Sequence, residues 1–304
     1  MASQGQTLSP QPPIREAGGG TTYLPRRWRR WGLAFLNHLV LVPLGVLFLL
    51  PLAWMLSTSL KDSAGVFAFP PQWIPDPLRF ENYILAMTAL PFGRYFWNTS
   101  VITFSAMIGQ LLSCSLVAFS FARLRWSGRH WLFLVVLSTM MLPSQVTLIP
   151  TFLIFRSLGW LDTFLPMIVP AFFGGGPFLI FLMRQFFMTL STELDDAARI
   201  DGCSSLGIYW RIILPLAKPV LIACAIFSFE SHWNDFIRPL VYLQSQENYT
   251  LSLALHAFNS NYGRGTEWNQ LMAASLVVML PVILIFFIAQ RYFIQGVVFT
   301  GVKG

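Results

Sequence analysis

The chain has 304 residues, of which 55% are hydrophobic and only 11% are charged. An average soluble domain is about a quarter charged, so the 20 basic and 13 acidic side chains are too few to solvate a soluble domain of this length. The mean hydropathy of +0.59 agrees with this shortage of charge. The composition excludes a disordered chain, a coiled coil and an ordinary soluble enzyme, and it predicts an all-α polytopic membrane protein.

The N-terminal region combines a polar tail with a first membrane span. Residues 1–24 are rich in Gly, Pro, Ser, Thr and Gln and have no apolar period, so we expect them to be disordered. A cluster of arginines at 26–30 follows, and we treat residues 1–30 as a basic tail. The apolar run at 33–56 is longer than the roughly 7–15 residues of a signal-peptide core. It is long enough to cross a bilayer, which takes about 20 residues.

Five more apolar runs complete six predicted transmembrane helices, at about 97–121, 130–154, 164–188, 217–240 and 269–292. Prolines inside them, such as Pro143, Pro170 and Pro281, are tolerated in a membrane bundle, where neighbouring helices satisfy the freed backbone groups. The Gly174–Gly176 run before Pro177 predicts a bend or a close helix contact. The predicted organisation is a tail at 1–30, a membrane domain at 31–294 and a C-terminal tail at 295–304.

The basic residues predict the orientation of the six spans. An even number of spans places both termini on one side, and that side receives 14 of the 20 basic residues but only 5 of the 13 acidic ones. Basic residues accumulate in cytoplasmic loops. We therefore expect both termini, the 122–129 turn and the 189–216 loop to be cytoplasmic. The net charge of +7 then reflects topology, and no nucleic-acid partner is expected.

The three cysteines carry no metal or disulfide pattern. Cys114, Cys203 and Cys224 are scattered without the spacing of zinc ligands. We expect them to be ordinary small apolar residues, with no metal site and no disulfide framework.

The 189–216 loop contains the signals of a short helix over about 193–201. Thr192 is a candidate N-cap, and Asp195 stands three residues later in a capping-box arrangement. Glu193 and Asp196 add negative charge to the first turn, where the helix dipole favours it. Gly202 fits the left-handed position after the helix end.

One face of this predicted helix is suited to docking. Leu194, Ala197, Ala198 and Asp201 recur at helical spacing, and the two alanines permit a close approach by a groove on a soluble partner. An apolar segment at 209–214 then leads into Pro215. The alternative interpretation is a surface turn that packs only on its own chain.

This loop resembles the EAA signature of the membrane subunits of ATP-binding cassette (ABC) importers. The resemblance lies in Asp196-Ala197-Ala198-Arg199-Ile200-Asp201-Gly202 and, after nine intervening residues, Ile212-Ile213-Leu214-Pro215. Asp196 replaces the glutamate usual in the family, which keeps the charge on a side chain one methylene shorter.

Further stretches make the resemblance more specific. They resemble carbohydrate importers of the maltose type and, within these, the permease subunit similar to the maltose-importer G subunit. These stretches are Ser59-Leu60-Lys61, Ile74-Pro75, Glu81-Asn82-Tyr83, Phe121-Ala122-Arg123-Leu124-Arg125, Trp233-Asn234-Asp235-Phe236 and Gly301-Val302-Lys303-Gly304. The resemblance implies the type I ABC importer permease fold with a cytoplasmic coupling helix. It also implies a location in the plasma (inner) membrane of a bacterium or archaeon.

The resemblance implies that the loop couples transport to a separate ATPase dimer. The implied coupling residues are Glu193, Asp195, Asp196, Ala197, Ala198, Asp201, Gly202, Ile212, Leu214 and Pro215. The chain has no phosphate-binding loop of its own, so it is not expected to be an enzyme or to bind a cofactor. ATP and Mg²⁺ are used by the partner. The tail residues Gly301, Lys303 and Gly304 would reach the ATPase interface; the alternative is a frayed end.

Two further partners follow from the resemblance. A second permease subunit would complete a heterodimer in the lipid bilayer, and an extracytoplasmic binding protein would deliver the solute. The outer loop at about 243–268 looks polar and flexible, and its Asn259, Asn261 and Gly263 would touch that binding protein. By composition alone it is a solvated loop.

Polar side chains inside the spans are candidates for the translocation path, because they are costly in a bilayer. The candidates are Gln110, Gln145, Glu230, His232 and Asn234. The alternative is hydrogen bonding between helices or contact with the second permease. In the maltose type, the sugar site lies mostly in the other permease subunit.

The predicted function is import of a sugar or sugar-like solute, with a glycerol-phosphate or other polyol solute as the alternative in the same type of system. Proteins of two other classes fit the sequence less well. A Mg²⁺-dependent membrane transferase would use Asp195, Asp196 and Asp201, but it needs a second acidic cluster that the cytoplasmic side lacks. An autonomous secondary transporter usually shows internal repeats, and none is convincing here.

Overall fold

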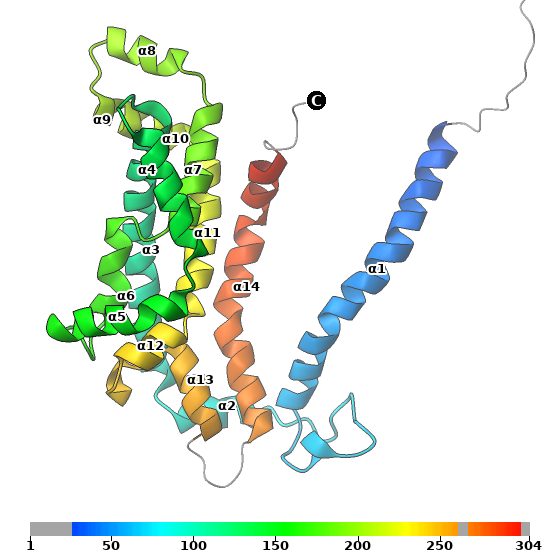
Figure 1. Cartoon of the computed structure of the whole chain (residues 1–304). Helices are drawn as coiled ribbons and strands as arrows, with labels where there is room; N and C mark the ends of the chain where they lie inside the picture. Colours follow the sequence, from blue (N-terminus) through cyan, green and yellow to red (C-terminus); the bar gives the residue numbers. More distant parts are fainter. Residues whose placement is uncertain (1–25, 261–266, 299–304) are drawn as a thin grey trace, which may run out of the picture. The chain divides into compact units, whose positions relative to one another are not determined.

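The computed structural model describes residues 26–260 and 267–298 (Figure 1). Every regular element of the described part is a helix and none is a strand, which confirms the all-α prediction. The chain divides into two units, residues 1–53 and 54–304. The predicted tail at 1–24 and residues 299–304 lie outside the described part, as do residues 261–266 of the outer loop.

Helix α1 (Arg26–Ser59) makes up most of the first unit and ends in the second. Its apolar part, Asn37–Ser59, is long enough to cross a bilayer, which confirms the first predicted span. Pro43 and Pro51 lie inside an uninterrupted helix.

Three more spans match the prediction closely. They are α3 (Phe92–Arg123), the segment Leu165–Thr189 and α14 (Trp268–Val298). The second of these comprises α6 (Leu165–Ile168), η3 (Val169–Phe173) and α7 (Pro177–Thr189), and the chain bends at Gly174, whose φ is +74°. Pro281 lies inside α14 without ending it.

The third span departs from the prediction of one helix over 130–154. Helices α4 (Arg129–Ser138) and α5 (Ser144–Ser157) meet at an angle of 99°, with η2 (Thr139–Met141) between them. The chain turns at Pro143, whose backbone is extended, and proline favours such a break because it lacks the N–H group that would continue the helical hydrogen bonding. The apolar composition concealed the break, because α5 remains largely apolar.

The fifth span, predicted over 217–240, is also broken. The segment Ser205–Leu216 meets α11 (Lys218–Trp233) at 81°, and α11 ends at Trp233. A separate helix, α12 (Ile237–Tyr242), begins beyond Asp235, whose carboxylate accepts a hydrogen bond from the backbone N–H of Arg238. This helix start explains why the span is shorter than its apolar run.

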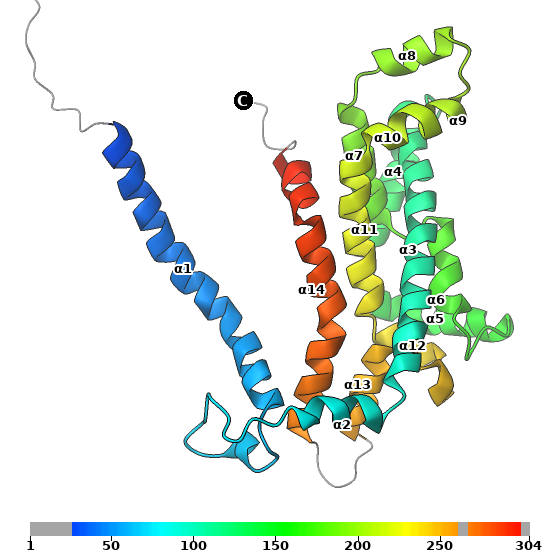
Figure 2. The same cartoon turned by 180° about the vertical axis from the view of Figure 1, so that it is seen from behind.

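Four helices of the described chain are long and apolar enough to cross a bilayer, and the two bent pairs bring the number to six if each is one span. Helix α3 is central to the second unit, and α7 and α11 lie beside it (Figure 2). One apolar cluster joins the end of α3 near Phe119 to α7 and to the segment around Tyr209. A second cluster joins the other end of α3 to α2 (Glu81–Ala89), α13 (Leu251–Ser260) and α14.

Most of the predicted outer loop at 243–268 is therefore folded. It contains η5 (Gln246–Asn248) and α13, and the apolar side chains of Leu251, Leu253 and Phe258 are buried in the bundle. The prediction of a flexible loop was wrong for this part because it relied on the polar residues and overlooked these buried ones.

Asp162 fixes the start of this outer segment. Its carboxylate accepts hydrogen bonds from the backbone N–H groups of Gln244 and Ser245, both at 2.9 Å, from the Ser245 hydroxyl, and from the Asn248 amide at 3.2 Å. Its own N–H donates to the Tyr242 carbonyl at 2.8 Å. The donors from Ser245 and Gln244 hold the pKa of the Asp162 carboxyl well below its usual range.

We predict that Asp162→Asn lowers the Tm of the purified protein at pH 7, because it weakens hydrogen bonds to a charged group, each worth about 1.5–3 kcal/mol. A carboxyl group with a lowered pKa stabilises the fold above its unfolded pKa of about 3.9 and loses that effect as the pH falls. The Tm difference between wild type and variant should thus shrink from about pH 5 downward. Asn tolerates the φ of +58° at this position.

The control is Glu81→Gln, which alters an exposed carboxylate on α2 whose ion pair with Arg79 spans 3.8 Å. Its Tm should stay close to wild type at all these pH values. A constant Tm difference between wild type and Asp162→Asn across the pH range would contradict the assignment.

Candidate functional site

Helix α8 (Glu193–Ile200) lies at one end of the bundle, and α2, α12 and α13 lie at the other (Figure 1). Its bounds agree with the predicted helix at 193–201. Gly202 has a φ of +78°, which confirms the left-handed position after the helix, and its N–H donates to the Arg199 carbonyl at 3.0 Å. The predicted Thr192 cap is wrong: Thr192 makes no side-chain cap bond, and the Ser191 hydroxyl accepts from the N–H of Glu193 instead.

A buried ion pair attaches α8 to the end of α3. Arg123 Nη1 lies 3.5 Å from Asp195 Oδ2, and both side chains are almost fully buried, with 3% and 7% exposed. Arg123 Nη2 also donates to the Leu190 carbonyl at 3.0 Å. The sequence predicted that Asp195 contacts the ATPase, but its side chain points into its own chain. Loss of Asp195 would leave the charge of Arg123 buried without a partner, which is strongly destabilising.

The outer face of α8 is formed by other residues. Asp196, Ala197 and Asp201 are exposed, together with Leu194 at 41% and Ile200 at 87%. We call these five residues the exposed face of α8. The predicted docking face also contained Ala198, which is buried in the core instead. Ile200 was missed, although it stands three residues after Ala197 on the same side of the helix.

The segment after α8 connects it to the bundle. It comprises α9 (Ser205–Ile208), the π-helical turn η4 (Tyr209–Ile213) and α10 (Leu214–Leu216). Tyr209 is fully buried, and its hydroxyl lies 2.7 Å from the Ser115 hydroxyl of α3. Ile212 and Leu214 pack against the same core, whereas Pro215 is exposed. These predicted coupling residues thus join α8 to α11.

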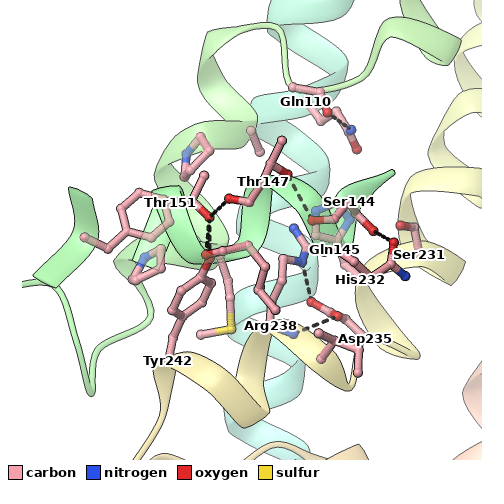
Figure 3. A pocket seen from close by; sticks show the side chains of 18 residues that line it. Gln110, Ser144, Gln145, Thr147, Thr151, Ser231, His232, Asp235, Arg238 and Tyr242 are labelled. Carbon is pink, nitrogen blue, oxygen red and sulfur yellow. Dashed lines mark hydrogen bonds and ion pairs between the residues drawn. The ribbon is translucent and has the colours of Figure 1, made fainter. Parts of the chain in front are cut away.

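A pocket of about 700 Å³ lies toward the α12 end of the bundle (Figure 3). Of the predicted path residues, Gln110, Gln145 and His232 line it. Glu230 and Asn234 do not line it, and both are exposed elsewhere. The structure thus brings three of the five candidates together.

Helix α5 supplies one wall of the pocket. Ser144, Thr147 and Thr151 line it at helical spacing, and the Thr151 hydroxyl lies 3.1 Å from the Tyr242 hydroxyl of α12. Sequence reasoning missed these residues because it placed them inside a straight membrane helix. Their i, i+3, i+7 spacing in an apolar run was the available signal.

Asp235 and Arg238 form the charged part of the pocket. Arg238 Nε lies 2.5 Å from Asp235 Oδ2, and the two side chains are 37% and 15% exposed. Nearby, His232 Nδ1 lies 2.7 Å from the Ser228 carbonyl. Because a carbonyl only accepts hydrogen bonds, Nδ1 carries the hydrogen, and Nε2 is left as an acceptor in the neutral ring.

Gln110 and its neighbour Ser113 also hold helices together. Gln110 Nε2 donates to the Gly175 carbonyl at 3.1 Å, its Oε1 accepts from the Ser228 hydroxyl at 2.7 Å, and Ser113 donates to the Ala171 carbonyl at 2.8 Å. Gln110 therefore bonds between helices, as the alternative interpretation expected, and it also lines the pocket.

Several predicted residues cannot be placed. Asn261, Gly263, Gly301, Lys303 and Gly304 lie outside the described residues, and Asn259 lies in α13 with its side chain undescribed. Within the described part, no three His, Cys, Asp or Glu side chains are grouped to hold a metal ion. The carboxylates considered for Mg²⁺ are not gathered: Asp195 pairs with Arg123, and Asp196 lies 3.8 Å from Arg199.

Comparisons with known proteins agree with this architecture. The chain is 34% identical over 274 residues to the arabinooligosaccharides transport system permease protein AraQ of Halalkalibacterium halodurans, covering 90% of this chain and 95% of that protein. It is 31% identical over 275 residues to the sn-glycerol-3-phosphate transport system permease protein UgpE of Yersinia enterocolitica, covering 88% and 97%.

A solved structure shares the fold. A chain of a bacterial ABC transporter involved in the import of the acidic polysaccharide alginate matches with a TM-score of 0.76 and 25% identity, covering 90% of this chain and all of that one. The profile of the family described as "Binding-protein-dependent transport system inner membrane component" matches residues 114–298. The chain therefore belongs to this family of multi-pass inner-membrane permeases, which are transport subunits and not enzymes.

Proposed function

We propose that this chain is one of two permease subunits of an ATP-driven importer and that it conducts a sugar or sugar-like solute delivered by an extracytoplasmic binding protein. The observation that carries the proposal is the structure of α8, which is attached to α3 by a buried ion pair and presents an exposed face away from the bundle. The similarity to an arabinooligosaccharide permease supports a carbohydrate solute.

The proposal places both termini and α8 in the cytoplasm. The charge distribution supports this orientation, because 14 of the 20 basic residues fall on that side of the six spans. The pocket then lies toward the extracytoplasmic side, since it is at the α12 end of the bundle.

The exposed face of α8 docks in a cleft of a separate ATPase subunit, which uses ATP and Mg²⁺. Ile200 and Asp196 are both exposed and stand one helical turn apart, and this pair suits a surface groove with an apolar floor and a basic rim. Movement of that cleft would reach α3 through Arg123 and α11 through η4 and α10. The C-terminal residues Gly301, Lys303 and Gly304 are proposed to meet the same subunit.

The outer end of the bundle receives the binding protein. Helix α13 lies at the end of the bundle opposite α8, and the proposed contact is this helix together with Asn259, Asn261 and Gly263. A glycerol-phosphate solute is the second candidate, favoured by the similarity to UgpE.

The direct test is deletion of the gene in its host, followed by uptake measurements with labelled arabinotriose, maltotriose and sn-glycerol 3-phosphate. We expect uptake of one neutral oligosaccharide to be lost and to return when the gene is supplied on a plasmid. Unchanged uptake of all three probes, or loss only of glycerol phosphate uptake, would contradict the carbohydrate assignment.

We predict that Asp195→Ala and Asp196→Ala fail in different ways. Asp195→Ala leaves Arg123 buried without its partner, which costs about 3–5 kcal/mol, so the Tm of the purified protein should fall along with transport. Asp196 is exposed and its ion pair with Arg199 is worth at most about 1 kcal/mol. Asp196→Ala should therefore keep the wild-type Tm but lose solute-stimulated ATP hydrolysis in the purified complex.

A double variant separates charge burial from helix docking. Arg123→Met with Asp195→Leu removes both buried charges, and well-packed apolar replacements of an ion pair are often neutral or stabilising. The Tm should recover relative to Asp195→Ala. If the double variant is no more stable than Asp195→Ala, the pair does not act as described.

We further predict that Gly202→Val uncouples the importer without preventing membrane insertion. A β-branched residue at a φ of +78° is strained by about 1–2 kcal/mol, which displaces the end of α8. Co-purification of the ATPase subunit and solute-stimulated ATP hydrolysis should both decrease. Gly202→Asn is the matched control, because Asn adopts this conformation readily and should retain coupling.

A further inference from the structure

The pocket between α5 and α12 has the composition of a site for hydroxyl groups. Five hydroxyl side chains line it, Ser144, Thr147 and Thr151 from α5, Ser231 from α11 and Tyr242 from α12 (Figure 3). The amides of Gln110 and Gln145 add further donors and acceptors. Thr147 donates to the Ser144 carbonyl at 3.0 Å, so its oxygen remains free to accept. Side chains that both donate and accept match the hydroxyls of a sugar.

The pocket also has an apolar side. Phe155, Met167, Pro170 and Ile237 line it alongside the polar residues. Phe155 is held in place by stacking on Trp160, with ring centroids 5.6 Å apart. A surface with hydroxyl groups on one wall and apolar groups on another fits a sugar ring, which has polar edges and apolar C–H faces.

The charges of the pocket cancel. Among its lining residues, the carboxylate of Asp235 and the guanidinium of Arg238 are joined at 2.5 Å, and His232 is the remaining titratable group apart from Tyr242. A phosphate or carboxylate ligand approaching Arg238 would meet the Asp235 carboxylate beside it. The like-charge repulsion in a half-buried site disfavours an anion.

We infer that this pocket is a solute-contact site on this subunit for an uncharged, polyhydroxylated solute such as one sugar unit of an oligosaccharide, and that the Asp235–Arg238 pair disfavours anionic solutes. The inference rests on the proposed function. It also selects a neutral solute over an anionic one. The names of the relatives include both kinds: neutral arabinooligosaccharides, and the anionic sn-glycerol 3-phosphate and acidic polysaccharide alginate.

The test is direct binding to the purified transporter complex in lipid nanodiscs, without its binding protein, so that the selectivity of the binding protein does not intervene. Saturation-transfer difference NMR is recorded with arabinotriose, maltotriose and sn-glycerol 3-phosphate as separate probes. We expect a signal from at least one neutral oligosaccharide and none from glycerol phosphate.

Variants assign the signal to the pocket. Thr147→Val keeps the shape of the side chain but removes its hydroxyl, and it should weaken oligosaccharide binding about fivefold, the loss expected for one hydrogen bond. The matched control is Thr139→Val, because Thr139 is an exposed threonine in η2 that does not line the pocket. Glu230→Gln, on α11 but outside the pocket, should also bind as wild type.

The Asp235→Asn variant tests the charge argument. It releases Arg238 from its pair, so the pocket gains a positive charge and glycerol phosphate should give a signal. The inference is overturned if wild type binds glycerol phosphate as well as the neutral probes. It is also overturned if no neutral probe binds, or if Thr147→Val and Asp235→Asn bind all probes like wild type.

These outcomes differ from failure of the proposed function. Loss of oligosaccharide uptake on gene deletion, together with no pocket-dependent binding, would support the proposed importer function and refute only the proposed site. Unchanged uptake of all three probes on deletion would refute the proposed importer function, whatever the NMR result.

Discussion

The constraint that shapes this protein is that a backbone group freed inside a membrane must find a partner within the protein. At the break in the fourth span, the partners come from α3: Ser113 donates to the Ala171 carbonyl and Gln110 donates to the Gly175 carbonyl. Beyond the end of the fifth span, Asp235 accepts from the N–H of Arg238 and so starts α12. These two interruptions are therefore supported by polar side chains that bond to the freed backbone groups.

These interruptions create the pocket. The 99° bend near Pro143 turns α5 away from α4 and lets its hydroxyl side chains face α12. A straight third helix would have kept Thr147 and Thr151 far from Tyr242. The same side chains that satisfy the backbone also line the space, since Gln110 and Asp235 belong to both sets. These two polar side chains are therefore already needed where they bond to the backbone, and they line the pocket from the same positions.

The sequence predicted the parts of the fold that depend on local pattern. The existence of the membrane helices, the bounds of α8 and the left-handed Gly202 all follow from apolar runs and from turn chemistry. Residues that depend on distant partners were harder to predict. Asp195 was read as an outward-facing charge because its partner, Arg123, lies about seventy residues earlier in the chain. The broken third and fifth spans were missed because apolar composition does not record direction, although Pro143 marked one break.

The position of α3 explains how the two ends of the subunit can act together. Arg123 contacts α8 at one end of this helix, and Gln110 lines the pocket thirteen residues earlier, which is about 20 Å along an unbroken helix. A second connection runs from η4 and α10 into α11, which carries His232 to the same pocket and Ser228 to Gln110. Gln110 and Ser228 are joined by a hydrogen bond at 2.7 Å, so the two connections meet. A displacement of α8 that moved α3 and α11 unequally would have to break this buried bond or shift the pocket wall with it. The geometry therefore favours concerted movement of both helices.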